Sequence, residues 1–125
     1  MSWGELLDKI TILRIKYERI ADVHARANVA RELRLLTEIA GEVIDEAELA
    51  EPIAQLRAVN EALWEIEDRI RECEAARDFG PGFVRLARSV YQQNDRRAAL
   101  KRRINELTGS RLVEEKSYAG WQAAA

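Results

Sequence analysis

The sequence contains little that could build a metal centre, a disulfide or a membrane span. It has one cysteine, Cys73, and one histidine, His24, so an intrachain disulfide and a site with several histidine ligands are both excluded. No run of about 18 apolar residues occurs, and the opening MSWGELLDK carries acids in place of an apolar signal core. We therefore expect a cytoplasmic protein without a membrane span, in a reducing compartment that suits the lone thiol.

Helix-breaking residues are also scarce. Two prolines and six glycines among 125 residues leave long stretches free of breakers. Hydrophobic residues make up 47% of the chain and charged residues 34%, which is typical of a folded helical protein and not of a disordered one. Since this length is the usual size of one domain, residues 1–125 are expected to form a single helical domain.

Apolar side chains recur at alternating spacings of three and four residues, the pattern of heptad seams. The first seam begins at Trp3, and Ser2 has the chemistry of an N-cap for its helix. Pro52 suits the first position of a later helix, and DFGPG at 78–82 is a strong turn signal. These features predict an all-α fold, an antiparallel bundle of about four helices with a mostly irregular C-terminal tail at about 110–125. The helices are predicted at about 3–22, 28–44, 52–77 and 81–108.

The net charge of −2 conceals a strong asymmetry along the chain. Residues 1–31 carry +2, residues 32–78 carry −9, residues 79–112 carry +6 and the remainder carries −1. Either acidic and basic helices face each other across the bundle, or a basic face receives an anionic partner. The overall negative charge argues against nucleic acid as that partner.

Polar residues interrupt the seams of the third and fourth predicted helices. If these helices form a hairpin about Gly80, then Asn60 lies near Leu100 or Lys101, and an up-down bundle brings the start of the first helix to the same depth. The predicted polar layer comprises Asp8, Lys9, Asn60, Arg88, Asn94, Arg97 and Lys101. Such a layer could fix register or oligomeric state, or form a ligand pocket, or be solvated in a different register.

Catalytic motifs are few and weak. No phosphate-binding glycine loop and no nucleophile elbow is present. The carboxylate pairs ELLD at 5–8, EVID at 42–45 and EIED at 65–68 resemble the Mg²⁺-holding helices of all-α nucleotide pyrophosphatases, although the upstream E-x-x-E block is missing. A chorismate-mutase-like site would use Lys9, Asn60, Arg97 and Lys101, whose spacing departs from that of the usual mutase helix. We assign no catalytic residue, metal site or cofactor from the sequence, and we expect Trp64 and Tyr91 in the core or at an interface.

Several blocks of the chain resemble a family of small uncharacterised bacterial all-α proteins, a domain of unknown function. The blocks are GELLDKITILRIKYERI at 4–20, ANVARELRLL at 27–36, NEALWEIEDRIRECE at 60–74, FGPGFVRLARSVYQQNDRRAALKRRIN at 79–105 and GSRLVEEKSY at 109–118. They cover nearly the whole chain and include the polar residues Asp8, Lys9, Asn60, Arg88, Asn94, Asp95 and Lys101. The resemblance implies genes encoded near surface-polysaccharide glycosyltransferases, and it carries over no catalytic residue.

Taken together, the residues and the resemblance favour a non-catalytic helical module. It would bind a protein partner or a small anionic ligand, as an accessory to cell-envelope polysaccharide synthesis. The alternative is a small all-α enzyme acting on an anionic substrate, by Mg²⁺-dependent hydrolysis of a nucleotide or phosphate ester or by a chorismate-mutase-like reaction. A third hypothesis is a purely structural dimerisation module, in which the chain forms a homodimer.

Overall fold

The computed structural model describes residues 1–109, which form two helical hairpins. The helices are α1 (Trp3–Arg19), α2 (Val23–Ala40), α3 (Ala50–Ala76) and α4 (Pro81–Thr108), and the short 3₁₀ turns η1 (Gly41–Asp45) and η2 (Ala47–Leu49) connect α2 to α3. The predicted all-α class with four antiparallel helices is therefore confirmed. The predicted irregular tail lies outside the described residues.

The first hairpin, α1–α2, is set by side-chain caps. The Ser2 hydroxyl accepts a hydrogen bond from the Glu5 backbone N–H at 3.0 Å, which confirms the predicted N-cap of α1. The helix ends at Arg19, before the predicted boundary near residue 22, and Asp22 caps α2 by accepting from the Ala25 N–H at 2.8 Å. The second helix therefore starts at Val23, and the predicted start near residue 28 is wrong. The Asp22 carboxylate caps the helix several residues before its apolar stripe begins.

The second hairpin, α3–α4, follows the predicted boundaries closely. Pro52 lies in the first turn of α3, where its missing N–H breaks no helical hydrogen bond. The helix ends at Ala76, its C-cap Arg77 has a left-handed φ of 53°, and the Asp78 carboxylate accepts from the Gly80 N–H at 3.1 Å. Pro81 then opens α4 with its fixed φ. This short turn explains why α3 and α4 are antiparallel neighbours.

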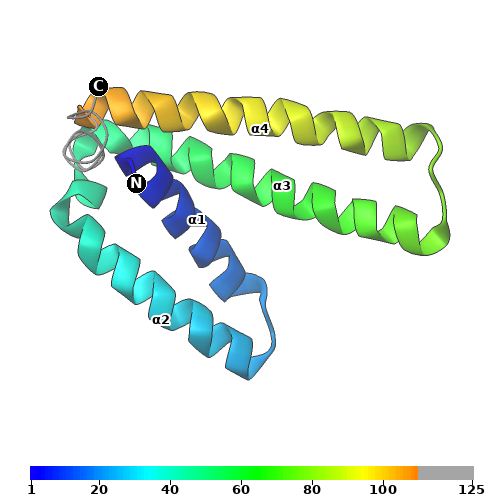
Figure 1. Ribbon diagram of the computed structural model, residues 1–125, viewed down its shortest axis with the longest axis horizontal. Coiled ribbons are helices and arrows are strands. Elements are labelled where there is room, and N and C mark those ends of the chain that lie inside the picture. The colour runs from blue at the N-terminus through cyan, green and yellow to red at the C-terminus, as the bar shows by residue number, and fades with distance from the viewer. Residues whose placement is uncertain (110–125) are drawn as a thin grey trace, which may run out of the picture.

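The two hairpins meet at one end and diverge from there (Figure 1). Helices α3 and α4 run side by side as a long pair, and α1 and α2 leave them at an angle. Helix α1 packs against all three other long helices, whereas α2 packs mainly against α1. None of the helices in residues 1–109 is long and apolar enough to cross a membrane.

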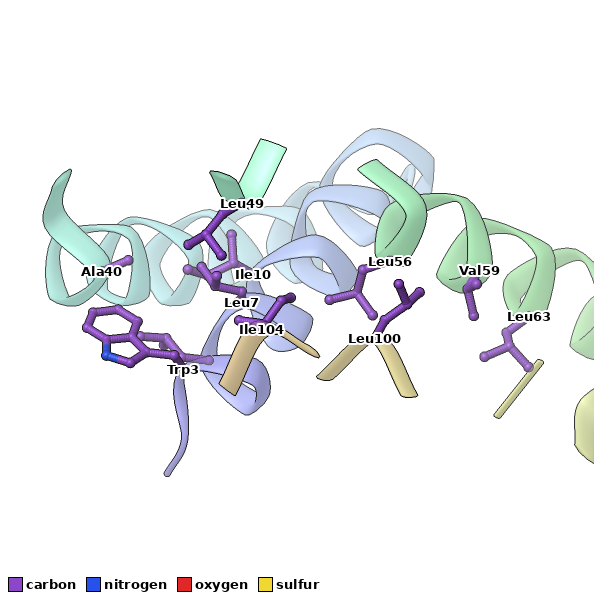
Figure 2. Close-up of a cluster of buried hydrophobic side chains, with 11 residues drawn as sticks. Trp3, Leu7, Ile10, Ala40, Leu49, Leu56, Val59, Leu63, Leu100 and Ile104 are labelled. Atoms are coloured by element: carbon purple, nitrogen blue, oxygen red, sulfur yellow. The ribbon is translucent and has the colours of Figure 1, made fainter. Parts of the chain in front are cut away.

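The hydrophobic core lies where the hairpins meet (Figure 2). Trp3, Leu7 and Ile10 of α1 belong to one cluster with Leu56 from the start of α3 and Ile104 from the end of α4. The same cluster also contains Leu6, Ala40, Leu49, Val59, Leu63 and Leu100. No residue from 65 to 96 is buried, and these parts of α3 and α4 project as a two-helix extension, which we call the distal arm (Figure 1).

Helix α1 approaches α4 closely at Gly4. A Cβ atom on Gly4 would lie 2.4 Å from the Lys101 carbonyl oxygen, so only glycine allows this crossing. The Gly4 N–H also donates to Asn105 Oδ1 at 2.8 Å. This contact brings the next turn of α1, which carries Asp8, against α4.

Candidate functional site

Asp8 lies at the centre of a polar network inside the junction of the hairpins. Its side chain is buried, and only 2% of the residue is exposed. Oδ1 accepts from Asn60 Nδ2 at 2.9 Å and from Arg97 Nε at 3.0 Å, while Oδ2 accepts from Arg97 Nη2 at 2.5 Å. One carboxylate of α1 thus joins α3 and α4 through charge-assisted hydrogen bonds.

Thr11 completes the network one turn further along α1. The Asn60 Nδ2 group also donates to Thr11 Oγ1 at 2.9 Å, and the Thr11 hydroxyl donates to the Asp8 carbonyl at 2.7 Å. Sequence reasoning missed Thr11, although its position three residues after Asp8 places it on the same helical face.

Arg97 and Lys101 of α4 neutralise Asp8 and Glu5 of α1. Lys101 Nζ lies 2.8 Å from Glu5 Oε1 and 4.0 Å from Asp8 Oδ2. Hydrogen bonding to Asp8 raises the pKa of Arg97, against the opposing effect of burial. The four groups carry equal numbers of positive and negative charges, and every Asp8 oxygen has a donor. The network is therefore balanced within the protein and suited to fixing how α1 sits on α3 and α4.

The structure brings together four of the seven residues of the predicted polar layer. Asp8, Asn60, Arg97 and Lys101 share the network, so Asn60 and Arg97 do not lie on opposite surfaces. Lys9 lies outside it, because its ammonium group pairs with Glu32 of α2 at 3.2 Å.

The remaining two predicted residues, Arg88 and Asn94, are exposed on the distal arm, beyond the reach of the network. Gln93, a polar residue in the seam of α4, also lies outside the network. The Gln93 Oε1 atom is buried and accepts no hydrogen bond from any described residue. The role of the predicted residues in function stays a prediction.

A second set of ion pairs closes the far end of the α1–α3 contact. Arg57 Nη2 lies 2.5 Å from Glu18 Oε1, and Arg19 Nη2 lies 3.5 Å from Glu61 Oε2. The hydrogen bond from Arg57 lowers the pKa of Glu18, and bonds to Glu18 and Glu61 raise the pKa of Arg57. These pairs are exposed, so they steer the contact more than they stabilise it.

Two open hollows flank the network along α1. The smaller, of about 170 Å³, lies between α1 and α3 and includes Asn60, Leu63 and Trp64. The larger, of about 520 Å³, extends toward α2 and includes Asp8 and Glu32. The side chains common to both hollows are Ile12, Lys16 and Arg97. We call the two neighbouring hollows together the notch.

Two of the three carboxylate pairs considered for Mg²⁺ form ion pairs with cations of the chain. Glu5 and Asp8 face Lys101 and Arg97, and the EVID pair lies on η1. In the EIED pair on α3, Asp68 contacts Arg71 at 2.7 Å and Glu65 contacts Arg19 at 3.5 Å. Within residues 1–109 no three Asp, Glu, His or Cys side chains gather as metal ligands.

The fold and the network together define an all-α protein of two divergent helical hairpins, tied at their junction by a buried carboxylate. The chain belongs to the family described as "Family of unknown function (DUF6165)", which matches residues 1–124. It matches no curated protein and no solved structure.

Proposed function

We propose that the protein is a non-catalytic helical interaction module, and that the notch is its binding site. The observation that carries this proposal is the contrast between the closed network and the open notch beside it. The Asp8 carboxylate, the Asn60 amide N–H group and the Thr11 hydroxyl satisfy one another, which leaves Asp8 and Thr11 little capacity for chemistry on a substrate. The notch, by contrast, is open to solvent.

The lining of the notch suggests the chemistry of its occupant. The exposed surface of the notch is more apolar than polar, with Ile12, Leu63 and Trp64 in the smaller hollow, and the carboxylates of Glu67 and Glu32 also line it. Lys16 has no ion pair among the described residues, and Arg97 binds Asp8 through Nε and Nη2, while its Nη1 donates to no described residue. An apolar side chain beside a carboxylate would match this surface, so we propose a segment of a protein partner that carries both.

The family resemblance extends this proposal to a pathway. Genes near surface-polysaccharide glycosyltransferases would make the module an accessory to cell-envelope polysaccharide synthesis. In that setting the module acts in the cytoplasm, and its partner is a component of the polysaccharide machinery. This assignment depends on gene neighbourhood and is separate from the binding proposal.

Site-specific photo-crosslinking tests the binding proposal in cells that carry the gene in its natural setting. A benzophenone amino acid replaces Ile12 in the notch, and a matched variant replaces Arg103, which is exposed elsewhere on α4. We expect one discrete crosslinked protein from position 12, absent from position 103 and weakened by Lys16→Glu. The same products from both positions, or none from position 12, would contradict the proposal. A specific partner unrelated to polysaccharide synthesis would keep the module and remove the pathway assignment.

One observation favours the enzymatic alternative. Lys16 and Arg97 line both hollows, so an anionic substrate in the notch would meet two cations. A thermal-shift screen with nucleotides, nucleotide sugars and dicarboxylates, each with and without Mg²⁺, separates the two functions. A ligand that binds the folded state raises the melting temperature by mass action. Our proposal expects no shift, and a saturable rise abolished by Lys16→Glu would favour the enzyme.

A further inference from the structure

We infer that two copies of the chain associate through the outer surface of α4, packed antiparallel about a two-fold axis near Tyr91. This surface is separate from the notch, and the inference goes beyond the proposed function. We call it the outer stripe. It consists of Val84, Ala87, Arg88, Tyr91, Asn94, Asp95 and Ala98.

The outer stripe has the pattern of a second seam on the same helix. Leu86, Val90 and Gln93 follow the seam of α4 that continues from its buried residues. Positions 84, 87, 91, 94 and 98 repeat the alternating spacing of three and four on another face. Tyr91 is 73% exposed and Val84 is 44% exposed, so two large apolar side chains of this seam have no cover in the monomer.

Small and amide side chains in the stripe suit helix-to-helix contact. Ala87 and Ala98 lie on either side of Tyr91 and allow a second helix to approach closely. Asn94 is the one amide among these seam positions, and a single asparagine in a seam is a known means of setting register and oligomeric state. The exposed position of Asn94, outside the polar network, is consistent with that role.

The charges of the stripe identify the occupant as a second copy in one orientation. Arg88 and Asp95 are exposed two helical turns apart, and neither has an ion pair within residues 1–109. An antiparallel two-fold axis between residues 91 and 92 places Arg88 beside Asp95 of the partner subunit, and the same pair forms again on the other side. Parallel packing would oppose like charges. The stripe is thus complementary to itself when reversed.

The expected dimer is weak because the stripe is short. From residue 84 to residue 98 an α-helix rises about 21 Å. A single helix pair of this length buries less than the roughly 1,600 Å² of a standard interface. We therefore expect association at micromolar concentrations, which is accessible to sedimentation velocity.

A charge-swap series tests the inference with the whole chain. Arg88→Glu places two acids opposite each other, Asp95→Arg places two arginines opposite each other, and the double variant restores both pairs in swapped form. We expect each single variant to dimerise at least about tenfold more weakly than the wild type, and the double variant to recover. Glu72→Arg, an exposed change on α3, is the matched control and should leave dimerisation unchanged.

Mixing the two single variants gives the sharpest result. The Arg88→Glu chain carries only acids at these positions and the Asp95→Arg chain carries only bases, so an equimolar mixture should form heterodimers although neither chain self-associates. Circular dichroism confirms that each variant is helical before mixing. A monomeric wild type at several hundred micromolar, single variants that dimerise like the wild type, or a mixture that stays monomeric would overturn the inference. None of these results bears on the crosslink at the notch.

Discussion

Removing Arg97 should destabilise the protein strongly, because it leaves the buried Asp8 carboxylate without its main partner. In Arg97→Met the aliphatic part of the side chain is kept and the guanidinium is lost. Asp8 would retain the Asn60 amide, and Lys101 lies 4.0 Å from Oδ2. The perturbation therefore isolates the cost of an under-compensated charge in a site whose side chain is 3% exposed.

The expected magnitude follows from how unequally the pair is buried. Leaving one member of a buried ion pair alone lowers the free energy of unfolding by about 3–5 kcal/mol. Because Asp8 keeps its hydrogen bond from Asn60, we expect Arg97→Met to lie near the lower value, about 3 kcal/mol. The Arg97 side chain is 29% exposed and can reach water, so Asp8→Leu should cost less, about 2 kcal/mol. The double variant removes both charges and should cost no more than Arg97→Met alone. The coupling energy between Asp8 and Arg97 is then at least about 2 kcal/mol.

Urea denaturation followed by circular dichroism measures the stability of the wild type, the two single variants and the double variant, which together form a double-mutant cycle. Lys101→Met is the control, because its closest partner is the exposed Glu5 and its loss should cost below about 1 kcal/mol. If the Asp8 and Arg97 effects simply add, or if Arg97→Met costs no more than Lys101→Met, the network does not fix the junction of the hairpins.

Three further predictions concern packing and pH. Gly4→Ala should lower the free energy of unfolding by about 1–3 kcal/mol, because its Cβ would clash with the α4 backbone. The control Gly82→Ala, whose Cβ would lie 3.8 Å from the nearest atom, should be neutral or slightly stabilising. Equal urea midpoints for the two variants would contradict this prediction. Ile104→Ala should cost about 2–5 kcal/mol because the side chain is fully buried, and Leu35→Ala, at an exposed site, less than about 0.5 kcal/mol in the same assay. The pKa of Glu18 is lowered below 4.5, so its ion pair stabilises the fold above that pH. The gap in urea midpoint between wild type and Glu18→Gln should be largest at neutral pH and close as pH falls toward 3, and a constant gap would refute the pair.

The number and order of the helices could be predicted because apolar spacing, turn residues and caps all agree. The start of α2 could not, because its first turn lies beyond the core and carries no apolar stripe. Only the Asp22 cap marks the start of α2. A single capping residue is a weaker sequence signal than the absence of apolar residues at helical spacing. Ile12 and Ile15 lie off the first seam, which indicates that α1 packs on more than one side, and α1 does contact three helices.

The polar network could be predicted in outline from hairpin arithmetic alone. Pairing residues about the turn brings Asn60 near Arg97 and Lys101, as observed. Arithmetic of this kind gives depth but not rotation, and neighbouring residues on a helix point about 100° apart. For that reason Asp8 enters the network, whereas Lys9 turns to α2. The angle between the hairpins depends on the close approach at Gly4, which no periodicity encodes.

The charge asymmetry of the chain is not neutralised between its acidic and basic helices. Acidic α3 and basic α4 are neighbours, yet no ion pair joins them within residues 1–109; the acids of α1 are what meet Arg97 and Lys101. The other cations of α4 therefore keep their charge at the surface, Arg88 among them. A helix whose basic charge is only partly neutralised inside its own chain repels a parallel copy of itself. It tolerates a reversed copy only where an acid such as Asp95 is correctly placed. The same asymmetry that made a basic face a plausible hypothesis thus restricts which partners α4 can accept.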